Sequence, residues 1–231
     1  MSVSKVRRIF TLTIMLAIII IIGAARAATT FGLPHELMDD EYLRLVNTDF
    51  LIDESERLTD LIKLTVRTKN DTEMRLRRVA ANALKDLVAA AEADGVRLYV
   101  TSAYREYAQQ RALYYNNLKD VGFDDHSTQL PGASEHQTGL AADVISREWL
   151  GYTLTPDFAT TPEAQWLEAH CADYGFIIRY PRAKEAVTGI IYEPWHIRYV
   201  GTMAAHYLMD NGLTLEELWF QWYLYLEDHG L

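Results

Sequence analysis

Hydrophobic and polar positions along the chain follow two periods, one typical of helices and the other of strands. Residues 72–94 place apolar side chains on one face of a predicted helix, and Gly95 follows them as a stop signal. VRLYVTS at 96–102 alternates and is rich in residues that favour strands, and LAADVIS at 140–146 also predicts a strand. Residues 162–175 predict another helix, which closes at a glycine. The chain therefore mixes helices and strands.

Shorter elements complete the predicted fold. They are a strand at 43–47, a helix at 104–118, a polar loop at 119–131, one or two strands within 176–180 and 189–201, and two helices after residue 202 separated at Asn211-Gly212. This mixture predicts a single α+β domain in which a small sheet is flanked by helices.

The first 27 residues differ from all those that follow. A basic head, MSVSKVRR, precedes an apolar run, and Ala25 and Ala27 end the segment in an A-x-A arrangement. This layout is typical of a secretory signal peptide that is cut after Ala27. The apolar run of roughly 15 to 17 residues is short for a bilayer span, which needs ~20, although an uncleaved membrane anchor is the alternative. We therefore predict an exported protein with a signal peptide or anchor at 1–27, a linker or arm at 28–42 and a folded domain at 43–231.

Composition and charge exclude some classes of protein. The 231 residues are 49% hydrophobic and 23% charged, which fits a globular domain. The net charge of −10, without a basic stripe, argues against a nucleic-acid partner. Cys171 is the only cysteine, so no internal disulfide can form, and its helical context predicts a small buried hydrophobic side chain. The oligomeric state is not predicted by any of these features.

The stretch PGASEHQTGLAADV, residues 131–144, contains a candidate pair of metal ligands. Gly139 permits a turn after His136, and strand alternation then puts Ala141 and Asp143 on one face. Asp143 can thus face the turn that carries His136, with space between them for an ion. A structural aspartate beside an incidental histidine is the alternative. The helical zinc-protease signature H-E-x-x-H is absent.

A second candidate segment is YEPWHIRYVG, residues 192–201. Glu193 and His196 are three residues apart, and Pro194 between them prevents a regular central strand. A kinked segment can direct both side chains into one cleft, where Trp195 could form a wall and lower the local dielectric constant. An edge strand with an exposed glutamate and a buried tryptophan is the alternative.

A third segment, TSAYREYAQQ at 101–110, places Arg105 at a junction between a strand and a helix. Its planar, permanently charged guanidinium group suits a carboxylate or a developing oxyanion. A solvated arginine at the start of a helix is the alternative.

Taken together, the three segments are far more specific than any one of them. S-A-Y-R, then S-E-H-Q-T-G-L-A-A-D, then E-P-W-H-x-R-Y-V-G resembles the zinc D-alanyl-D-alanine carboxypeptidase family of the VanY type. That family shares its fold with D-Ala-D-Ala dipeptidases, lysostaphin-type enzymes and the hedgehog signalling domain. The resemblance covers roughly residues 40 to 215. It implies an α+β domain with a mostly antiparallel sheet and a zinc cleft.

The resemblance also implies a role for each candidate residue. Three side chains would ligate Zn²⁺, two would act in catalysis and three would contact the substrate. These are the metal ligands His136, Asp143 and His196, the general base Glu193, the oxyanion stabiliser Arg105, and the substrate-binding residues Gln110, Ser134 and Trp195.

The implied activity is removal of the terminal D-alanine from peptidoglycan stem peptides, of either the D,D or the L,D type, in the bacterial cell envelope. The predicted export segment agrees with this location. One alternative is an endopeptidase of the same fold, and another is a non-catalytic zinc module that binds the cell wall. The presence of both Glu193 and Arg105 favours catalysis, because a binding module needs neither.

Overall fold

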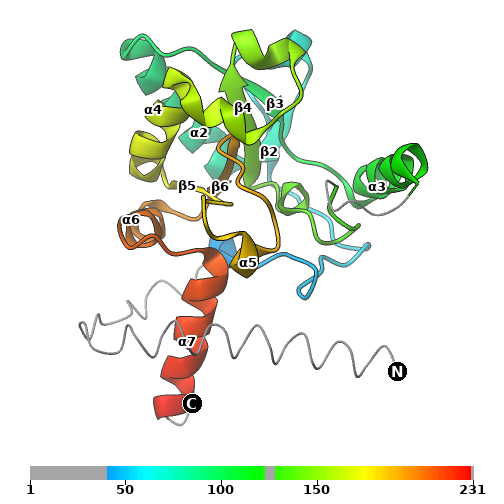
Figure 1. Ribbon diagram of the computed structural model, residues 1–231, viewed down its shortest axis with the longest axis vertical. Coiled ribbons are helices and arrows are strands. Elements are labelled where there is room, and N and C mark those ends of the chain that lie inside the picture. Colours follow the sequence, from blue (N-terminus) through cyan, green and yellow to red (C-terminus); the bar gives the residue numbers. More distant parts are fainter. Residues whose placement is uncertain (1–40, 123–127, 230–231) are drawn as a thin grey trace. The chain divides into compact units, whose positions relative to one another are not determined.

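A four-stranded sheet forms the centre of the domain in the computed structural model, which describes residues 41–122 and 128–229 (Figure 1). The strand order is β3-β4-β6-β5, and every neighbouring pair is antiparallel. The strands are β3 (Leu98–Ser102), β4 (Ala141–Ser146), β6 (His196–Tyr199) and β5 (Phe176–Ile178). This arrangement confirms the predicted α+β domain with a small antiparallel sheet.

Helices surround the sheet, and several of them are short. The α-helices are α2 (Arg78–Ala93), α3 (Tyr107–Val121), α4 (Pro162–His170), α5 (Glu185–Thr188), α6 (Thr202–Asp210) and α7 (Leu215–His229). Single 3₁₀ turns lie at Glu41–Leu43, Lys69–Asp71, Glu135–Thr138, Glu148–Gly151, Pro156–Thr160 and Cys171–Tyr174. The two predicted helices of the tail are confirmed, and they separate where expected.

The hydrophobic core lies between the sheet and helix α2. Leu84 and Leu87 of α2 pack in one cluster with Val100 of β3 and Val144 of β4. Cys171 belongs to the same cluster and is fully buried, which confirms its predicted packing role. Burial raises the pKa of its thiol to about 12, so Cys171 is not a nucleophile near neutral pH.

Alternation along β4 separates the core from the opposite face of the sheet. Ala142 and Val144 join the main core, whereas Asp143 does not. Asp143 lies directly opposite His196 in the β4–β6 register. The predicted alternation of β4 is therefore correct, and Asp143 and His196 lie on the face of the sheet opposite the main core.

The helix predicted at 72–94 begins later than expected. Arg75–Arg77 forms strand β2, which pairs antiparallel with β1 (Leu61–Lys63), and α2 starts at Arg78. Other segments also bond to this strand, because Tyr104 N–H donates to the carbonyl of Arg75 and the N–H of Arg77 donates to Gly139. Tertiary hydrogen bonds therefore override the local helical pattern.

The strand predicted at 43–47 is wrong. The 3₁₀ turn Glu41–Leu43 precedes irregular backbone there. Side chains take the carbonyls that a neighbouring strand would have used. Arg198 Nη2 donates to the carbonyls of Tyr42 and Arg44 at 2.9 and 3.0 Å, and Trp219 Nε1 donates to that of Leu43 at 2.7 Å.

Two further predictions extend too far along the chain. The segment 189–195 is not a strand, because Pro194 and Trp195 form a turn before β6 begins. The loop predicted from residue 119 starts later, since α3 continues to Val121, and residues 123–127 lie outside the described part of the chain.

The predicted signal peptide or anchor at 1–27, and nearly all of the predicted arm at 28–42, lie outside the described residues. Both stay predictions. Within residues 41–122 and 128–229, no helix has the length and apolar character needed to cross a bilayer.

Gly139 provides the turn that separates His136 from β4, and we expect Gly139→Ala to destabilise the fold. Its φ of +67° lies in the left-handed region, which costs a non-glycine residue about 1–2 kcal/mol. An added Cβ would also lie 3.0 Å from the Cγ of Arg77 and from the Cδ1 of Leu58. Crowding adds about 1 kcal/mol, the lower end of overpacking costs, because these side chains can shift. Denaturant unfolding measures the total.

Gly95→Ala is the matched control for this prediction. Gly95 has a φ of +81°, and an added Cβ would meet nothing within 4 Å. It therefore reports the backbone cost alone. Equal losses of unfolding free energy in the two variants would contradict the crowding around Gly139.

Candidate active site

Three side chains from three different elements meet on the side of the sheet opposite the main core. His136 lies in the 3₁₀ turn Glu135–Thr138, Asp143 in β4 and His196 at the start of β6. All three are buried, and each offers a ligand atom within 4.8 Å of the others. Two of these distances are short, at 2.9 Å between His196 Nδ1 and Asp143 Oδ1, and 3.3 Å between His136 Nε2 and Asp143 Oδ2. The structure thus brings together the three predicted ligands.

Hydrogen bonding gives the two imidazoles opposite orientations. His136 Nδ1 donates to the carbonyl of Ala103 at 2.8 Å, which leaves Nε2 facing Asp143. His196 instead presents Nδ1 to Asp143. A hydrogen bond at one ring nitrogen selects the nitrogen that remains available as a ligand.

The protonation states of the three side chains are set by burial and by one another. Burial opposes the charge of Asp143, but His136 and His196 outweigh it and hold the pKa of its carboxyl well below the usual range. Burial lowers the pKa of His136, and this favours the neutral imidazole. Burial also opposes the charged form of His196, but the hydrogen bond to Asp143 and the nearby carboxylate of Glu135 prevail and raise its pKa to about 9.

This donor set suits zinc. Two imidazoles and one carboxylate form a common catalytic set, and zinc bonds of 2.0–2.2 Å place tetrahedral ligands about 3.3–3.6 Å apart. The distances among the three ligand atoms bracket that spacing. No other cluster of such ligands occurs in the part of the chain that the structure describes.

A tight turn fixes Glu193 beside His196. The N–H of His196 donates to the carbonyl of Glu193 at 3.1 Å, with Pro194 in the second position, where proline favours a β-turn. The N–H of Glu193 donates in turn to the carbonyl of Tyr180 at 3.0 Å. Glu193 Oε2 lies 3.9 Å from His196 Nδ1. The predicted kink therefore directs both side chains to one place.

Glu193 has the protonation behaviour of a general base. Its side chain is 22% exposed, and burial raises the pKa of its carboxyl to about 7. The charge of His196 acts in the opposite direction, and that of Asp143 adds to the rise. A carboxyl with a pKa near the working pH can both accept and return a proton.

Arg105 is tied to the same site through its backbone and its side chain. Its N–H donates to the carbonyl of His136 at 3.1 Å. Its Nη2 donates to Ser102 Oγ at 3.0 Å, and its Nη1 donates to Gln110 Oε1 at 2.7 Å. A guanidinium has five N–H donors, so others remain for a ligand. Burial lowers the pKa of Arg105, while the charge of Asp143 opposes this.

The three predicted substrate contacts are all buried. Gln110 bonds at both ends of its amide, since Nε2 donates to the carbonyl of Gln129 at 2.6 Å, and it therefore orients Arg105. Ser134 precedes the turn that carries His136. Trp195 packs against Ile145 in a second core cluster and is 5% exposed. Substrate contact by these three side chains stays a prediction.

Sequence reasoning missed the buried charges and the aromatic ring around His196. The ring of Tyr180 lies 5.0 Å from that of His196. Glu135, Arg179 and Arg198 are fully buried. An available signal was the placement of the two arginines within apolar strand segments, FIIRY and HIRY, because such arginines need a buried carboxylate.

A cavity of about 160 Å³ adjoins this site, and its lining includes Tyr180. Residues 46–48, 128–130 and 188–190 supply most of its walls, which carry threonine, asparagine and glutamine side chains beside aliphatic ones.

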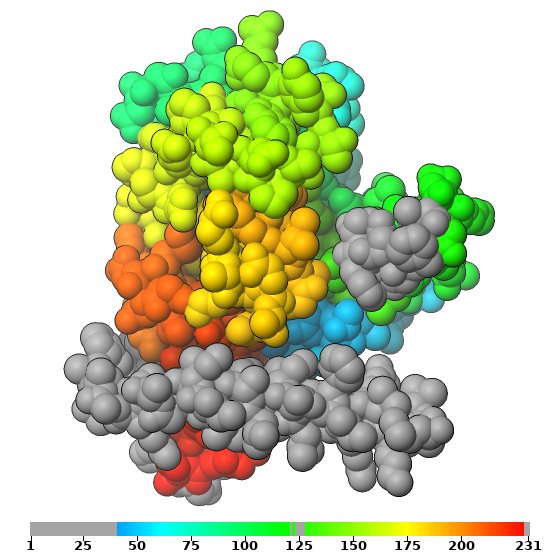
Figure 2. All heavy atoms as spheres, viewed as in Figure 1, coloured from blue at the N-terminus to red at the C-terminus, as the bar shows by residue number. Residues whose placement is uncertain are grey.

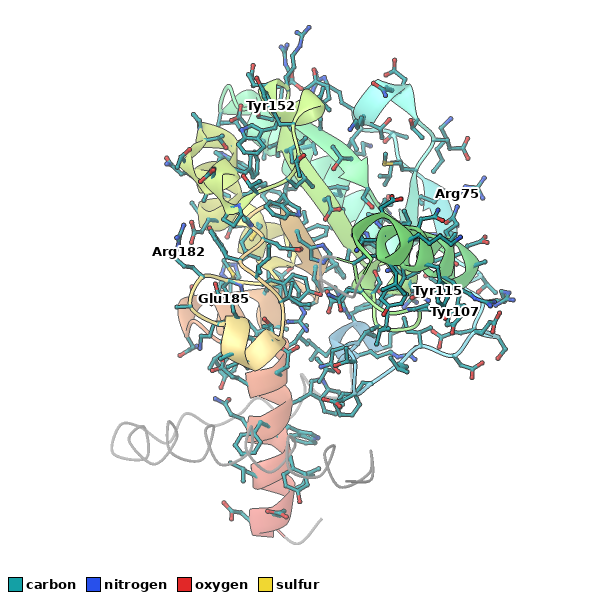
Figure 3. The ribbon with its side chains drawn as sticks, turned by 45° about the vertical axis from the view of Figure 1, so that its right-hand side comes forward. Arg75, Tyr107, Tyr115, Tyr152, Arg182 and Glu185 are labelled. Atoms are coloured by element: carbon teal, nitrogen blue, oxygen red, sulfur yellow. The ribbon has the colours of Figure 1, made fainter. Side chains whose placement is uncertain are left out.

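Figure 2 shows the segment between β5 and β6 exposed at the front of the molecule. In Figure 3, Tyr107 and Tyr115 of α3 lie on one side of the domain, and Arg182 and Glu185 lie near α5 on the other.

The chain resembles known proteins over most of its length. The sequence pattern of the family described as VanY, D-alanyl-D-alanine carboxypeptidase, matches residues 73–202. YodJ of Bacillus subtilis (strain 168) is 39% identical over 183 residues, which are 77% of this chain and 67% of YodJ. The matched segment contains the candidate ligands His136, Asp143 and His196, together with Glu193 and Arg105.

Solved structures resemble it as well. The LD-carboxypeptidase LdcB has a TM-score of 0.72 and 39% identity, and the match covers 77% of this chain and 85% of that chain. A variant of the vancomycin-resistance D,D-pentapeptidase VanY, solved with Zn(II), has a TM-score of 0.62 and 33% identity, with coverage of 77% and 98%.

Proposed function

Because this chain belongs to the VanY family of D-alanyl-D-alanine carboxypeptidases, we propose that it uses zinc to remove the C-terminal D-alanine from peptidoglycan stem peptides. The observation that carries the proposal is the position of Glu193 on the turn that also supplies His196, beside two further metal-binding side chains. A metal site and a base with a raised pKa at one place suit hydrolysis.

The metal would be held by Nε2 of His136, the carboxylate of Asp143 and Nδ1 of His196. When bound, zinc would act as a Lewis acid and lower the pKa of a coordinated water towards ~7. Zn(II) in the related VanY structure supports this choice of metal.

Glu193 would perform the proton transfers of the reaction. It accepts a proton from the water that attacks the carbonyl carbon of the scissile amide. It then delivers a proton to the amide nitrogen as the C–N bond breaks, so that D-alanine and the shortened stem leave. Its distance of 3.9 Å from a metal-facing atom of His196 agrees with this role.

Arg105 would stabilise the oxyanion that develops on the scissile carbonyl. Ser102 and Gln110 hold the guanidinium in place before the substrate arrives, so little reorganisation is needed during the reaction. The adjoining cavity, whose lining mixes aliphatic side chains with threonine, asparagine and glutamine, would accept part of the stem peptide. Action on peptidoglycan implies a cell-envelope location, to which the predicted N-terminal export segment would deliver the chain.

The test is incubation of the purified protein with stems that end in D-Ala-D-Ala and with stems that end in one D-Ala, followed by mass spectrometry. We expect loss of one terminal alanine and no loss after chelation, with activity restored by added zinc. The preferred stem decides between D,D and L,D activity. Cleavage only within the stem or a cross-bridge would identify an endopeptidase. Bound zinc without any cleavage would contradict the proposed enzymatic activity and favour a non-catalytic module that binds the cell wall.

A further inference from the structure

A cluster of paired charges lies next to His196, away from solvent. Glu135 Oε1 accepts hydrogen bonds from Arg179 Nε at 2.7 Å and from Arg198 Nη1 at 2.8 Å. These three side chains are fully buried. Arg179 also donates to both carboxylate oxygens of Glu216, at 2.6 and 2.9 Å. Two positive and two negative charges therefore compensate one another, as buried charges require.

Two polar atoms at the edge of this cluster lack a hydrogen bond, and they face each other. Glu135 Oε2 and His196 Nε2 are both buried without a partner. They lie 3.7 Å apart. Because buried polar atoms almost always find a partner, this pair marks a contact that a small rotation of the imidazole would complete.

We propose that Glu135 is a positioning residue that accepts a hydrogen bond from the Nε2–H of His196 and thereby presents Nδ1 to the metal. The inference rests on the zinc site proposed above. An acceptor at Nε2 keeps the proton there and leaves the Nδ1 lone pair free, and it also fixes the plane of the ring. The carbonyl of Ala103 does the same for His136 from the other ring nitrogen.

The arginines determine which oxygen of Glu135 faces the histidine. Both guanidinium groups bind Oε1, so Oε2 is the oxygen that remains for His196. Arg198 is itself fixed by the carbonyls of Tyr42 and Arg44. The carboxylate therefore has a single orientation, which a hydrogen bond to a metal ligand needs.

Glu216 extends this arrangement to the C-terminal helix. It lies in the first turn of α7, which begins near α5 and runs away from the sheet (Figure 1). Its two-point contact with Arg179 holds the guanidinium that in turn holds Glu135. Helix α7, which follows the family-matched segment, would thus support the proposed metal site through Glu216 and Arg179.

The experiment measures the zinc dissociation constant of the full chain by competition with a chromophoric chelator. In Glu135→Gln we expect zinc to bind about 10–100-fold more weakly, as for other lost partners of ligating histidines. Glu216→Gln should weaken binding in the same direction by a smaller factor. Glu217→Gln is the matched control, because Glu217 occupies the next position of α7 and pairs with Lys184 instead. Its zinc affinity should equal that of the unchanged protein.

Long-range ¹H–¹⁵N spectra of the histidines provide a readout that general destabilisation does not change. With zinc bound, His196 should carry its proton on Nε2, and in Glu135→Gln that proton should exchange faster with water. If the unchanged protein binds no zinc, both the proposed zinc site and this positioning role are overturned. If it binds zinc and a folded Glu135→Gln binds equally well, the positioning role is overturned. If Glu135→Gln does not fold, Glu216→Gln decides, and an unchanged affinity there overturns the role.

Discussion

Glu193→Gln should lower kcat/KM about 10²–10⁴-fold while leaving zinc affinity nearly unchanged. This is the range that general acid–base catalysis contributes, and Glu193 is the one carboxyl at the site with a pKa raised to about 7. The amide has nearly the same shape but cannot accept the proton of the attacking water. Hydrolysis of a D-Ala-terminated stem, with zinc content measured in the same preparation, checks the expectation.

The pH profile distinguishes loss of the base from a general defect. Glu193 acts as a base only when ionised, so kcat/KM should fall as the pH falls through its pKa. A bound cation favours the ionised carboxylate over the protonated acid, so the fall in kcat/KM on the acid side of the profile should be centred at or below about pH 7. The residual activity of Glu193→Gln should not show this fall. An identical fall in both proteins would assign the titration to another group.

Unfolding measurements provide the control for Glu193→Gln. The pKa of Glu193 is higher in the folded protein than in the unfolded chain. Ionisation of Glu193 therefore lowers the free energy of unfolding as the pH rises from about 4.5 to about 7. The metal-free variant should therefore be at least as stable as the unchanged protein at pH 8. Glu168→Gln, at an exposed position of α4, should change neither stability nor activity.

Arg105→Lys should lower kcat about 10²–10³-fold, the usual cost of losing one oxyanion donor. Lysine keeps the positive charge but loses the planar set of donors that Ser102 and Gln110 orient. The defect should appear mainly in kcat, since the donor acts on charge that develops during the reaction. Steady-state kinetics on the preferred stem separates kcat from KM.

Arg111→Lys is the matched control for Arg105→Lys. Arg111 lies exposed on α3 and contacts only the ring of Tyr115 among the described interactions. It should retain full activity. A rise in KM with unchanged kcat in Arg105→Lys would instead assign the guanidinium to the terminal carboxylate of the substrate.

Local signals were sufficient for much of the fold and for the positions of several candidate site residues, whereas the roles of these residues came from the resemblance to a family. The alternation in β4 correctly placed Asp143 opposite the main core, and Pro194 correctly indicated a kink between Glu193 and His196. Glycines marked the ends of helices, as at Gly95. These features depend on neighbouring residues, which a single sequence contains.

The incorrect or missing predictions involve groups whose partners lie far away along the chain. Residues 43–47 are apolar enough for a strand, but Arg198 binds the carbonyl of Arg44 and Trp219 that of Leu43, each from more than 150 positions away. Arg75–Arg77 fits a helical pattern and yet pairs with β1. Glu135 precedes the candidate metal ligand His136 in sequence, but its proposed role depends on arginines that only the tertiary structure brings to it.

The turn before β6 has a consequence for how such an enzyme can change its substrate range. The hydrogen bond between the N–H of Glu193 and the carbonyl of Tyr180 closes the loop 181–192 at its base. Residues 188–190 of that loop line the cavity, whereas the candidate base Glu193 and the candidate ligand His196 follow the closure. Tyr192 packs in the main core, and Lys184 binds Glu217 of α7, so both ends of the loop are held in place. Exposed side chains between these two anchors can therefore vary, and alter the choice of stem peptide, without displacing the groups that carry out the reaction.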